Sequence, residues 1–331
     1  MNFSSGLGER EIIEKIWGCL DKMPRMPVPF GDDVSAVELG DGKLVVLKTD
    51  MLVAETDVPP GMSLRQAARK AVVMNVSDFA AKGVKPIAML VSLGLPKKLT
   101  AEENVEEIGR GLNAGAREYN AYIIGGDTNE ASDVVISVSL FGIAKKDALM
   151  LRSEAKPEDL VAVTGGFGKT TAGLKILLDG LKAPEKLRKI LVNSVLMPYA
   201  RLREGLALSR TRAVTASIDS SDGLAWSLHE IARASSVGFS ITHLPIAKEA
   251  AEFARINNLD PLELTLYGGE EYELVLTIKP NLWEKAEKAV EKVGGKLIRI
   301  GRVTAEEQIT LEINGEKHVV EPRGWEHFRS R

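Results

Sequence analysis

The sequence predicts an α/β protein built from two successive domains. Short apolar segments of strand length, such as 160–164, alternate with longer segments of helical periodicity, such as 64–82. A polar stretch at 145–159 interrupts this alternation, which then starts again. Because domains commonly span about 100–200 residues, the 331-residue chain is expected to form one domain over 1–150 and a second over 151–331.

Capping signals help to define the elements of the first half. Ser63 can cap the start of its first helix, and Gly83 follows the end of that helix. Thr100 and Glu103 form a capping box for the start of a second helix. We expect strands at 43–49, 87–94, 121–124 and 133–142, and helices at 64–82 and from 100 to about 119.

The second half repeats the alternation of strands and helices. A glycine-rich turn follows its first strand, and the dipeptide Asn314-Gly315 predicts a tight hairpin turn close to its end. We expect strands at 160–164, 213–218 and 272–278, helices from about 170 and at 185–208, 223–234 and 281–293, and short strands within 296–321.

The composition excludes several classes of protein. The net charge is −3 and the sequence has no basic stripe, so a nucleic-acid partner is not expected. No apolar run approaches the roughly 18 residues of a membrane span, and the N-terminal residues do not resemble a secretory signal. Cys19 is the only cysteine, which excludes an intrachain disulfide and a cysteine zinc site. We therefore expect a cytoplasmic protein with no membrane partner.

Aspartates recur next to the predicted strands. Ligands of open α/β sheets bind at the carboxyl ends of strands, so aspartates at these ends are expected to form one acidic rim. Taken alone, each aspartate is also explained as a turn residue or a helix cap. The aspartates in question are Asp32, Asp33, Asp50, Asp127, Asp219 and Asp222.

A crowd of carboxylates is destabilising unless cations neutralise it. Magnesium takes oxygen ligands and commonly bridges carboxylates to substrate phosphates. An acidic rim can therefore hold an anionic nucleotide only through several cations. The pattern predicts a multi-metal nucleotide site and disfavours a phosphate pocket made of lysine and arginine.

The predicted helix 64–82 adds one more carboxylate. Ala67, Ala71, Asn75 and Asp78 follow at spacings of four and three, so they share a face. A polar pair on such a face is expensive to bury without partners. Asp78 is interpreted as a metal ligand; the alternative is that Asn75 and Asp78 cap neighbouring backbone.

The glycine turn GGFGKT at 165–170 does not match a P-loop. Val163 stands where that motif requires glycine, and Thr171 stands where a dinucleotide fingerprint requires its third glycine. Two interpretations stay open: the turn binds an anion through backbone N–H groups, or it is a plain tight turn. The four histidines show no metal-ligand spacing and are interpreted as structural or exposed: His229, His243, His318 and His327.

Taken together, the motifs resemble the thiamine-monophosphate kinase family over nearly the whole chain. Any one of them also occurs in the wider superfamily of aminoimidazole-ribotide synthetase. The motifs are GDDVSAV (31–37), LKTDMLV (47–53), RKAVVMNVSDFAAKGVKP (69–86), YNAYIIGGDT (119–128), LRSEAKPEDLVAVTGGFGKTTAGL (151–174), SIDSSDGL (217–224), GGEEYEL (268–274) and GWEHF (324–328).

The resemblance implies a fold, a reaction and a set of site residues. The fold would be the two-domain α/β (α+β) fold of the aminoimidazole-ribotide synthetase type, with an N-terminal domain that dimerises through its sheet. The site would lie in the cleft between the domains. Implied magnesium ligands are Asp33, Thr49, Asp50, Asp78, Asp127, Asp219 and Asp222. Implied ATP contacts are Tyr119, Gly126, Asp127, Arg152 and Ser221, and implied contacts to thiamine monophosphate are Asp57, Glu270 and Trp325.

Four positions depart from the pattern of the family. Asp57 stands where many bacterial members have histidine, and Lys48 replaces a small hydroxyl residue. Ser227 replaces an aspartate, and Glu271 stands where aspartate is usual. None of these changes removes an implied metal ligand.

The expected reaction is direct in-line attack of a phosphate oxygen of thiamine monophosphate on the γ-phosphorus of ATP. A phosphate monoester has its second pKa near about 6, so no general base is needed and no catalytic side chain of that kind is expected. Two alternatives remain: another ATP-using enzyme of the superfamily, such as one like the ribotide cyclo-ligase, and a non-catalytic nucleotide-binding protein.

Overall fold

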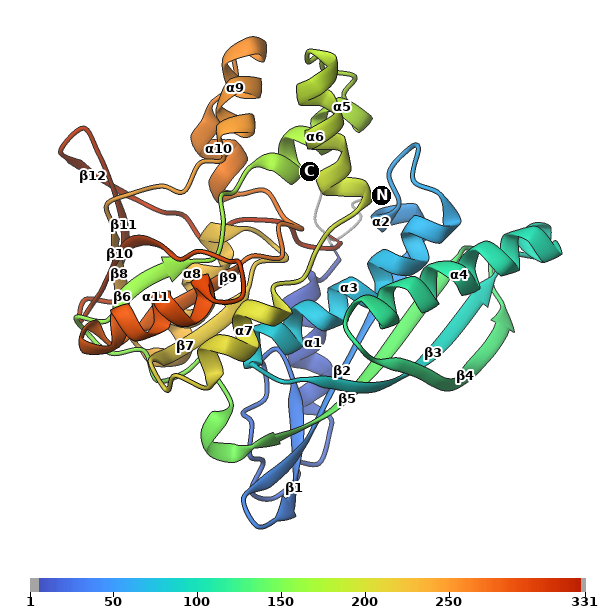
Figure 1. Ribbon diagram of the computed structural model, residues 1–331, viewed down its shortest axis with the longest axis horizontal. Coiled ribbons are helices and arrows are strands. Elements are labelled where there is room, and N and C mark those ends of the chain that lie inside the picture. Colours follow the sequence, from blue (N-terminus) through green and yellow to red (C-terminus); the bar gives the residue numbers. More distant parts are fainter. Residues whose placement is uncertain (1–5, 329–331) are drawn as a thin grey trace.

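The computed structural model describes residues 6–328, so the outer ends of the two expected domains, 1–5 and 329–331, lie outside the described residues. It contains two β-sheets with helices packed between and around them (Figure 1). This arrangement confirms the predicted α/β class. Within residues 6–328, no helix is both long enough and apolar enough to cross a membrane.

The elements of the first half surround one sheet. They are α1 (Glu9–Gly18), β1 (Ser35–Gly40), β2 (Lys43–Val53), α2 (Ala54–Asp57), α3 (Leu64–Lys82), β3 (Pro86–Leu95), α4 (Glu102–Glu118), β4 (Tyr122–Glu130) and β5 (Val135–Lys145). The strand order is β1-β2-β5-β3-β4. Only β3 and β4 pair in parallel; the other neighbours are antiparallel. Helices α3 and α4 lie along one face of this sheet (Figure 1).

The second half forms a seven-stranded sheet with the order β12-β11-β8-β10-β6-β9-β7. Its strands are β6 (Leu160–Val163), β7 (Val214–Asp219), β8 (Gly238–Ile241), β9 (Leu274–Ile278), β10 (Ile298–Thr304), β11 (Ile309–Ile313) and β12 (Glu316–Val319). Its helices are α5 (Lys169–Leu178), α6 (Glu185–Leu196), α7 (Leu202–Ser209), α8 (Leu224–Ser235), α9 (Lys248–Asn257), α10 (Pro261–Leu266) and α11 (Trp283–Glu291). Because β9 is antiparallel to both β6 and β7, β6 and β7 run in the same direction. Their carboxyl ends therefore lie on the same side of the sheet.

Helix α3 connects the two sheets. Ser63 accepts a hydrogen bond from the N–H of Gln66 at its start, and Gly83 ends it with φ 66°, so both predicted ends are confirmed. The helix contacts β2 and β5 of the first sheet and β7 of the second. It is buried nearly all round, and its polar residues therefore depend on partners from both halves.

Three local predictions were wrong. Thr100 does not cap α4, because its hydroxyl donates to the carbonyl of Lys97 in a preceding turn. The helix expected at 185–208 is two helices, α6 and α7, separated at 197–201 around Pro198. The strands expected to end near 49 and 124 continue as β2 to Val53 and β4 to Glu130, because exposed strand positions tolerate polar residues.

Candidate active site and metal centre

Three buried carboxylates form the centre of the candidate site. Asp33 precedes β1, Asp78 lies on α3 and Asp219 is the last residue of β7. One carboxylate oxygen from each lies within 4.8 Å of those of the other two. The group therefore joins the first sheet, the central helix and the second sheet, and it includes three of the seven expected metal ligands.

Asp33 is neutralised by two cations of the protein. The Nζ of Lys82 lies 2.8 Å from Asp33 and 2.7 Å from Asp32. The guanidinium of Arg152 also donates to Asp33, with Nε 2.8 Å from Oδ1. Burial disfavours the charged form of Asp33, but Arg152 and Lys82 outweigh burial, and the pKa of this carboxyl is lowered.

Asp78 and Asp219 are less well compensated. Burial raises the pKa of Asp78 well above its usual value; Lys48 opposes this effect, and the negative charges of Asp219 and Asp33 add to it. Burial, followed by the charge of Asp33, raises the pKa of Asp219 to about 6. Ser77 donates a hydrogen bond of 2.6 Å to Asp219. Two carboxylates that resist ionisation in the free protein indicate a place where additional positive charge is favourable.

The donor set fits a hard divalent cation. All three groups offer carboxylate oxygens, which magnesium prefers, and their spacing allows one ion to contact more than one of them. Held there, magnesium would neutralise the carboxylates and bind phosphate oxygens. Asp33, Asp78 and Asp219 are the residues that would hold it.

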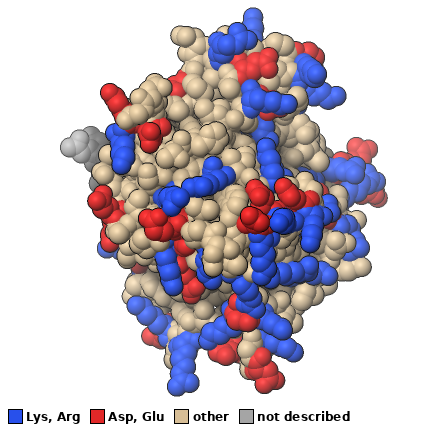
Figure 2. Space-filling model, turned by 60° about the vertical axis from the view of Figure 1, so that its left-hand side comes forward, with Lys and Arg blue, Asp and Glu red and all other residues tan. Residues whose placement is uncertain are grey.

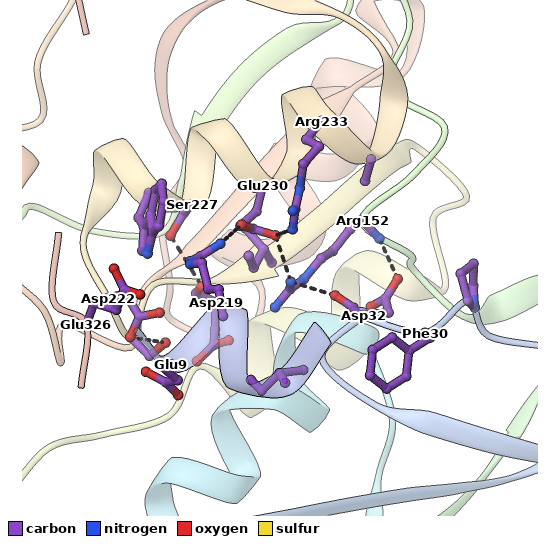
Figure 3. A pocket seen from close by; sticks show the side chains of 18 of the residues that line it. Glu9, Phe30, Asp32, Arg152, Asp219, Asp222, Ser227, Glu230, Arg233 and Glu326 are labelled. Carbon is purple, nitrogen blue, oxygen red and sulfur yellow. Dashed lines mark hydrogen bonds and ion pairs between the residues drawn. The ribbon is translucent and has the colours of Figure 1, made fainter. Parts of the chain in front are cut away.

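A pocket of about 490 Å³, drawn in Figure 3, is lined by Asp219 of this centre. Five expected site residues line it: Arg152, Asp219, Ser221, Asp222 and Trp325. Burial, with a contribution from the negative charge of Glu9, raises the pKa of Asp222 to about 7. The pocket thus combines carboxylates, an arginine and an aromatic ring, which suits a phosphorylated ligand with a flat ring system.

Glu230, a residue that the sequence did not single out, organises one wall of the pocket (Figure 3). It pairs with Arg152 at 3.3 Å and with Arg233 at 2.7 Å, and it also accepts from Arg10. The guanidinium of Arg10 lies 3.6 Å from the ring centre of Trp226, a cation–π geometry. The network fixes the position of Arg152 and attaches α1 to the pocket.

Lys70 brings two expected substrate residues together. Its buried ammonium lies 2.5 Å from the carboxylate of Glu270 and donates to the carbonyl of Asp57 at 2.8 Å. Glu270 has φ 62°, and its N–H donates to the carbonyl of Ser221 at 2.6 Å. A non-glycine residue in this region is strained, and such strain clusters at functional sites. Sequence reasoning missed Lys70; the signal that could have identified it is that a lysine within a predominantly apolar helix needs a partner.

The glycine turn after β6 does bind an anion, but one that belongs to the chain. The carboxylate of Glu271 accepts from the N–H groups of Gly168 and Thr170 at 2.7 and 3.0 Å. Burial raises the pKa of Glu271 to about 7, against the stabilising effect of these donors. The turn does present backbone N–H groups to an anion, as one interpretation held. That anion is the carboxylate of Glu271, which occupies the N-terminus of α5.

Asp50 and Thr49 point to opposite faces of β2, because successive residues of a strand alternate. Asp50 shares the inner face with Lys48, whose pKa responds to its charge. Thr49 accepts a hydrogen bond from the hydroxyl of Ser139 at 3.1 Å on the outer face. The prediction that Asp50 ends its strand was wrong, since β2 continues to Val53.

Asp127 also lies inside its strand, not at its end. In the sheet register, Asp127 lies beside Ser92 of β3. Ser92 in turn pairs with Ser137 of β5, and Ser137 pairs with Met51 of β2. Three strand spacings of about 4.8 Å put Asp127 about 14 Å from β2 within one chain. The structure therefore does not bring Asp127 to the three central carboxylates of the same chain, and the expected single rim is only partly formed.

Two expected ATP contacts have clear packing roles. Gly126 lies against β3, where an added Cβ would come within 1.8 Å of the carbonyl of Val91. Tyr119 is buried, and its hydroxyl accepts from the N–H of Ala200 at 2.9 Å. These observations explain both residues without ATP, and their contacts with ATP stay predictions.

The fold and site define an AIR synthase related protein. Sequence models of that family match residues 31–144 for its N-terminal domain and residues 156–314 for its C-terminal domain. A thiamine-monophosphate kinase of Nitrosopumilus maritimus is 39% identical over 285 residues, covering 86% of this chain and 89% of the relative. The corresponding kinase of Pyrococcus horikoshii is 39% identical over 303 residues, covering 91% of each. The chain belongs to the thiamine-monophosphate kinase family.

Solved structures agree with this assignment. AaThiL complexed with AMPPCP and TMP superposes with a TM-score of 0.85 at 30% identity, covering 98% of this chain and all of that one. A hydrogenase maturation protein HypE from E. coli has a TM-score of 0.69 at 19% identity. The second likeness concerns the fold alone.

Proposed function

We propose that the protein transfers the γ-phosphoryl group of ATP to thiamine monophosphate and forms thiamine diphosphate, the last step in the synthesis of that cofactor. The observation that carries the proposal is the group of Asp33, Asp78 and Asp219 beside a pocket that contains Arg152 and Trp325. The similarity to relatives of this activity and to a complex with AMPPCP and TMP supports the choice of substrates.

The residues of the site explain how two anions can react. The phosphate of thiamine monophosphate is largely dianionic near neutral pH, so its oxygen attacks without a general base. Arg152 supplies a fixed positive charge at the pocket, and the buried carboxylates would hold the metal cations. Asp33, Asp78 and Asp219 would hold magnesium, whose positive charge would screen the repulsion between the two anions and stabilise the charge of the group in transfer. The leaving group is ADP, which departs opposite the attacking oxygen.

The individual roles follow the expectations from sequence. The proposed ligands of several magnesium ions are Asp33, Thr49, Asp50, Asp78, Asp127, Asp219 and Asp222. ATP would contact Tyr119, Gly126, Asp127, Arg152 and Ser221, and thiamine monophosphate would contact Asp57, Glu270 and Trp325. Lys70 supports this assignment of the substrate residues, because it holds Asp57 and Glu270 together.

A homodimer is proposed through the outer face of the first sheet. No described helix covers this face (Figure 1). It exposes apolar side chains of neighbouring strands. The residues are Val37, Leu47, Met51, Leu90 and Ile143, whose exposed fractions are 40–50% or slightly more. Exposed apolar patches of this kind mark interaction sites. The same face carries Thr49 and the strand of Asp127, so a partner there would lie next to two proposed ligands.

We place the reaction in the cytoplasm, where ATP and magnesium are available and a lone cysteine stays reduced. A nucleic-acid partner is not proposed. On the face drawn in Figure 2, lysine and arginine side chains are interspersed with aspartate and glutamate. A polyanion would require a continuous basic stripe.

The decisive experiment incubates the protein with ATP, magnesium and thiamine monophosphate, and separates the products by chromatography. Thiamine diphosphate should form with the monophosphate and not with free thiamine. Asp78→Asn and Asp219→Asn should each lower turnover at least about a hundredfold while the protein stays folded. Turnover at the wild-type rate in both variants would rule out the carboxylate site.

A further inference from the structure

Lys48 is a positive charge among carboxylates that are proposed to bind metal ions. Its Nζ lies 3.0 Å from Oδ2 of Asp78, and the Lys48 side chain is 21% exposed. It extends from the inner face of β2, the face that also carries Asp50. The negative charges of Asp78, Asp50 and Asp33 attract this ammonium. A cation in this position competes with any metal ion for the oxygens of Asp78.

The other cations of the site have different surroundings. Lys82 is fully buried, pairs with Asp32 and Asp33 and donates to the carbonyl of Ser217. These three partners hold the Lys82 ammonium in a fixed place within the structure. Arg152 is likewise shared among several acceptors. Among the described residues, Asp78 is the one acceptor of the Lys48 ammonium, and Lys48 is the one cationic partner of Asp78.

Each of the two groups thus depends on the other. Without Lys48, Asp78 would be a buried carboxylate facing Asp219, Asp33 and Asp50, and it would have to recruit another cation. With Lys48 in place, a divalent ion bound through Asp78 would lie a few ångströms from an ammonium, where repulsion between cations is strong.

We infer that Lys48 takes the place of one divalent cation beside Asp78, so that the site holds one ion fewer than its carboxylates would otherwise bind. The inference rests on the proposed function, since it concerns the metal ions of that site. Lys48 is accordingly a positioning residue: its ammonium occupies an oxygen of Asp78 and sets the number of exchangeable ions. No bond forms or breaks on Lys48 itself.

The test counts ions without turnover. Mn²⁺ replaces magnesium, and the free Mn²⁺ is measured by electron paramagnetic resonance while the full chain is titrated in the absence of nucleotide. Lys48→Ser should bind one more Mn²⁺ per chain than wild type, or bind its weakest ion at least about ten times more tightly. Lys43→Ser is the matched control, because Lys43 lies exposed at the start of the same strand; it should behave as wild type.

Equal counts and affinities in wild type and Lys48→Ser would overturn the inference. The double variant Lys48→Ser with Asp78→Asn should lose the additional ion, and an ion that persists there would also overturn it. If Lys48→Ser does not fold, Lys48→Gln keeps a hydrogen-bond donor without the charge and should gain the ion in the same way. Failure of the proposed function is recognised separately, by the absence of thiamine diphosphate with the wild-type protein.

Discussion

Removing the ammonium of Lys82 tests the central electrostatic network. This side chain is completely buried, and it holds Asp32 at 2.7 Å and Asp33 at 2.8 Å. It also donates to the carbonyl of Ser217 on β7 at 2.7 Å. Lys82→Met replaces the aliphatic part of the side chain with one of similar length, but two buried carboxylates and one carbonyl lose their partner.

The expected loss of stability is large. Removing one partner of a buried ion pair commonly destabilises a protein by about 3–5 kcal/mol. Adding Asp32→Asn to Lys82→Met should recover about 1–2 kcal/mol. Arg152 still pairs with Asp33 in the single variant, whereas Asp32 has lost its ion pair with Lys82. Lys85→Met is the matched control: Lys85 is exposed three residues further on, and its replacement should change stability by less than about 0.5 kcal/mol.

Urea unfolding at pH 7.5, followed by circular dichroism in EDTA, measures these differences. EDTA is essential, since a metal ion at Asp33 would replace part of the missing charge. A loss below about 1 kcal/mol for Lys82→Met would refute the reasoning. So would a double variant that is less stable than Lys82→Met alone.

Three further predictions concern pH, the glycine turn and assembly. Because burial raises the pKa of Asp219 to about 6 in the folded protein, above its unfolded value of about 3.9, its ionisation lowers stability as pH rises from about 4 to 6. In EDTA, Asp219→Asn should therefore be more stable than wild type by about 2–3 kcal/mol at pH 7.5 and equal to it at pH 4, as urea unfolding would show; a constant difference across this range would contradict the cause. Glu271→Ala should lower the unfolding free energy by about 1–3 kcal/mol, since the N–H groups of Gly168 and Thr170 lose their acceptor. In the same measurement, Glu271→Gln should lower the unfolding free energy by less than half of that amount. Leu90→Lys, on the exposed outer face of the first sheet, should weaken dimerisation at least about a hundredfold in light-scattering measurements while the circular dichroism spectrum stays that of the folded protein; an unchanged dimer would place the interface elsewhere.

Local signals predicted the parts of the fold that depend on local chemistry. The ends of α3 follow from a capping serine and a left-handed glycine, and the turn at Asn314-Gly315 has positive φ at both residues, as its dipeptide requires. The shared face of Asn75 and Asp78 follows from helical periodicity alone. Such features depend on neighbours within a few residues, which a single sequence contains.

Contacts between residues that are far apart in the sequence could not be predicted from such local signals. An aspartate after an apolar run looks like a strand end, but Asp50 and Asp127 continue their strands, because the register is set by neighbouring strands and not by the run itself. The role of Lys82 depends on the loop before β1 and on β7 meeting at one helix end. Nothing near Lys82 in the sequence distinguishes it from the exposed Lys85.

The position of α3 has a consequence for how the site forms. This helix supplies Asp78 to the proposed metal centre, Ser77 to Asp219 and Lys70 to Glu270, so its side chains contact both the carboxylate group and a proposed substrate residue. Each contact reaches a residue of the second half, whereas Lys48 approaches Asp78 from the first sheet. A carboxylate group assembled from separate units is repulsive until its counter-ions are in place. We therefore expect formation of the site and packing of the two sheets against α3 to be cooperative. Variants that weaken this packing should lower the affinity for metal ions even where every ligand is retained.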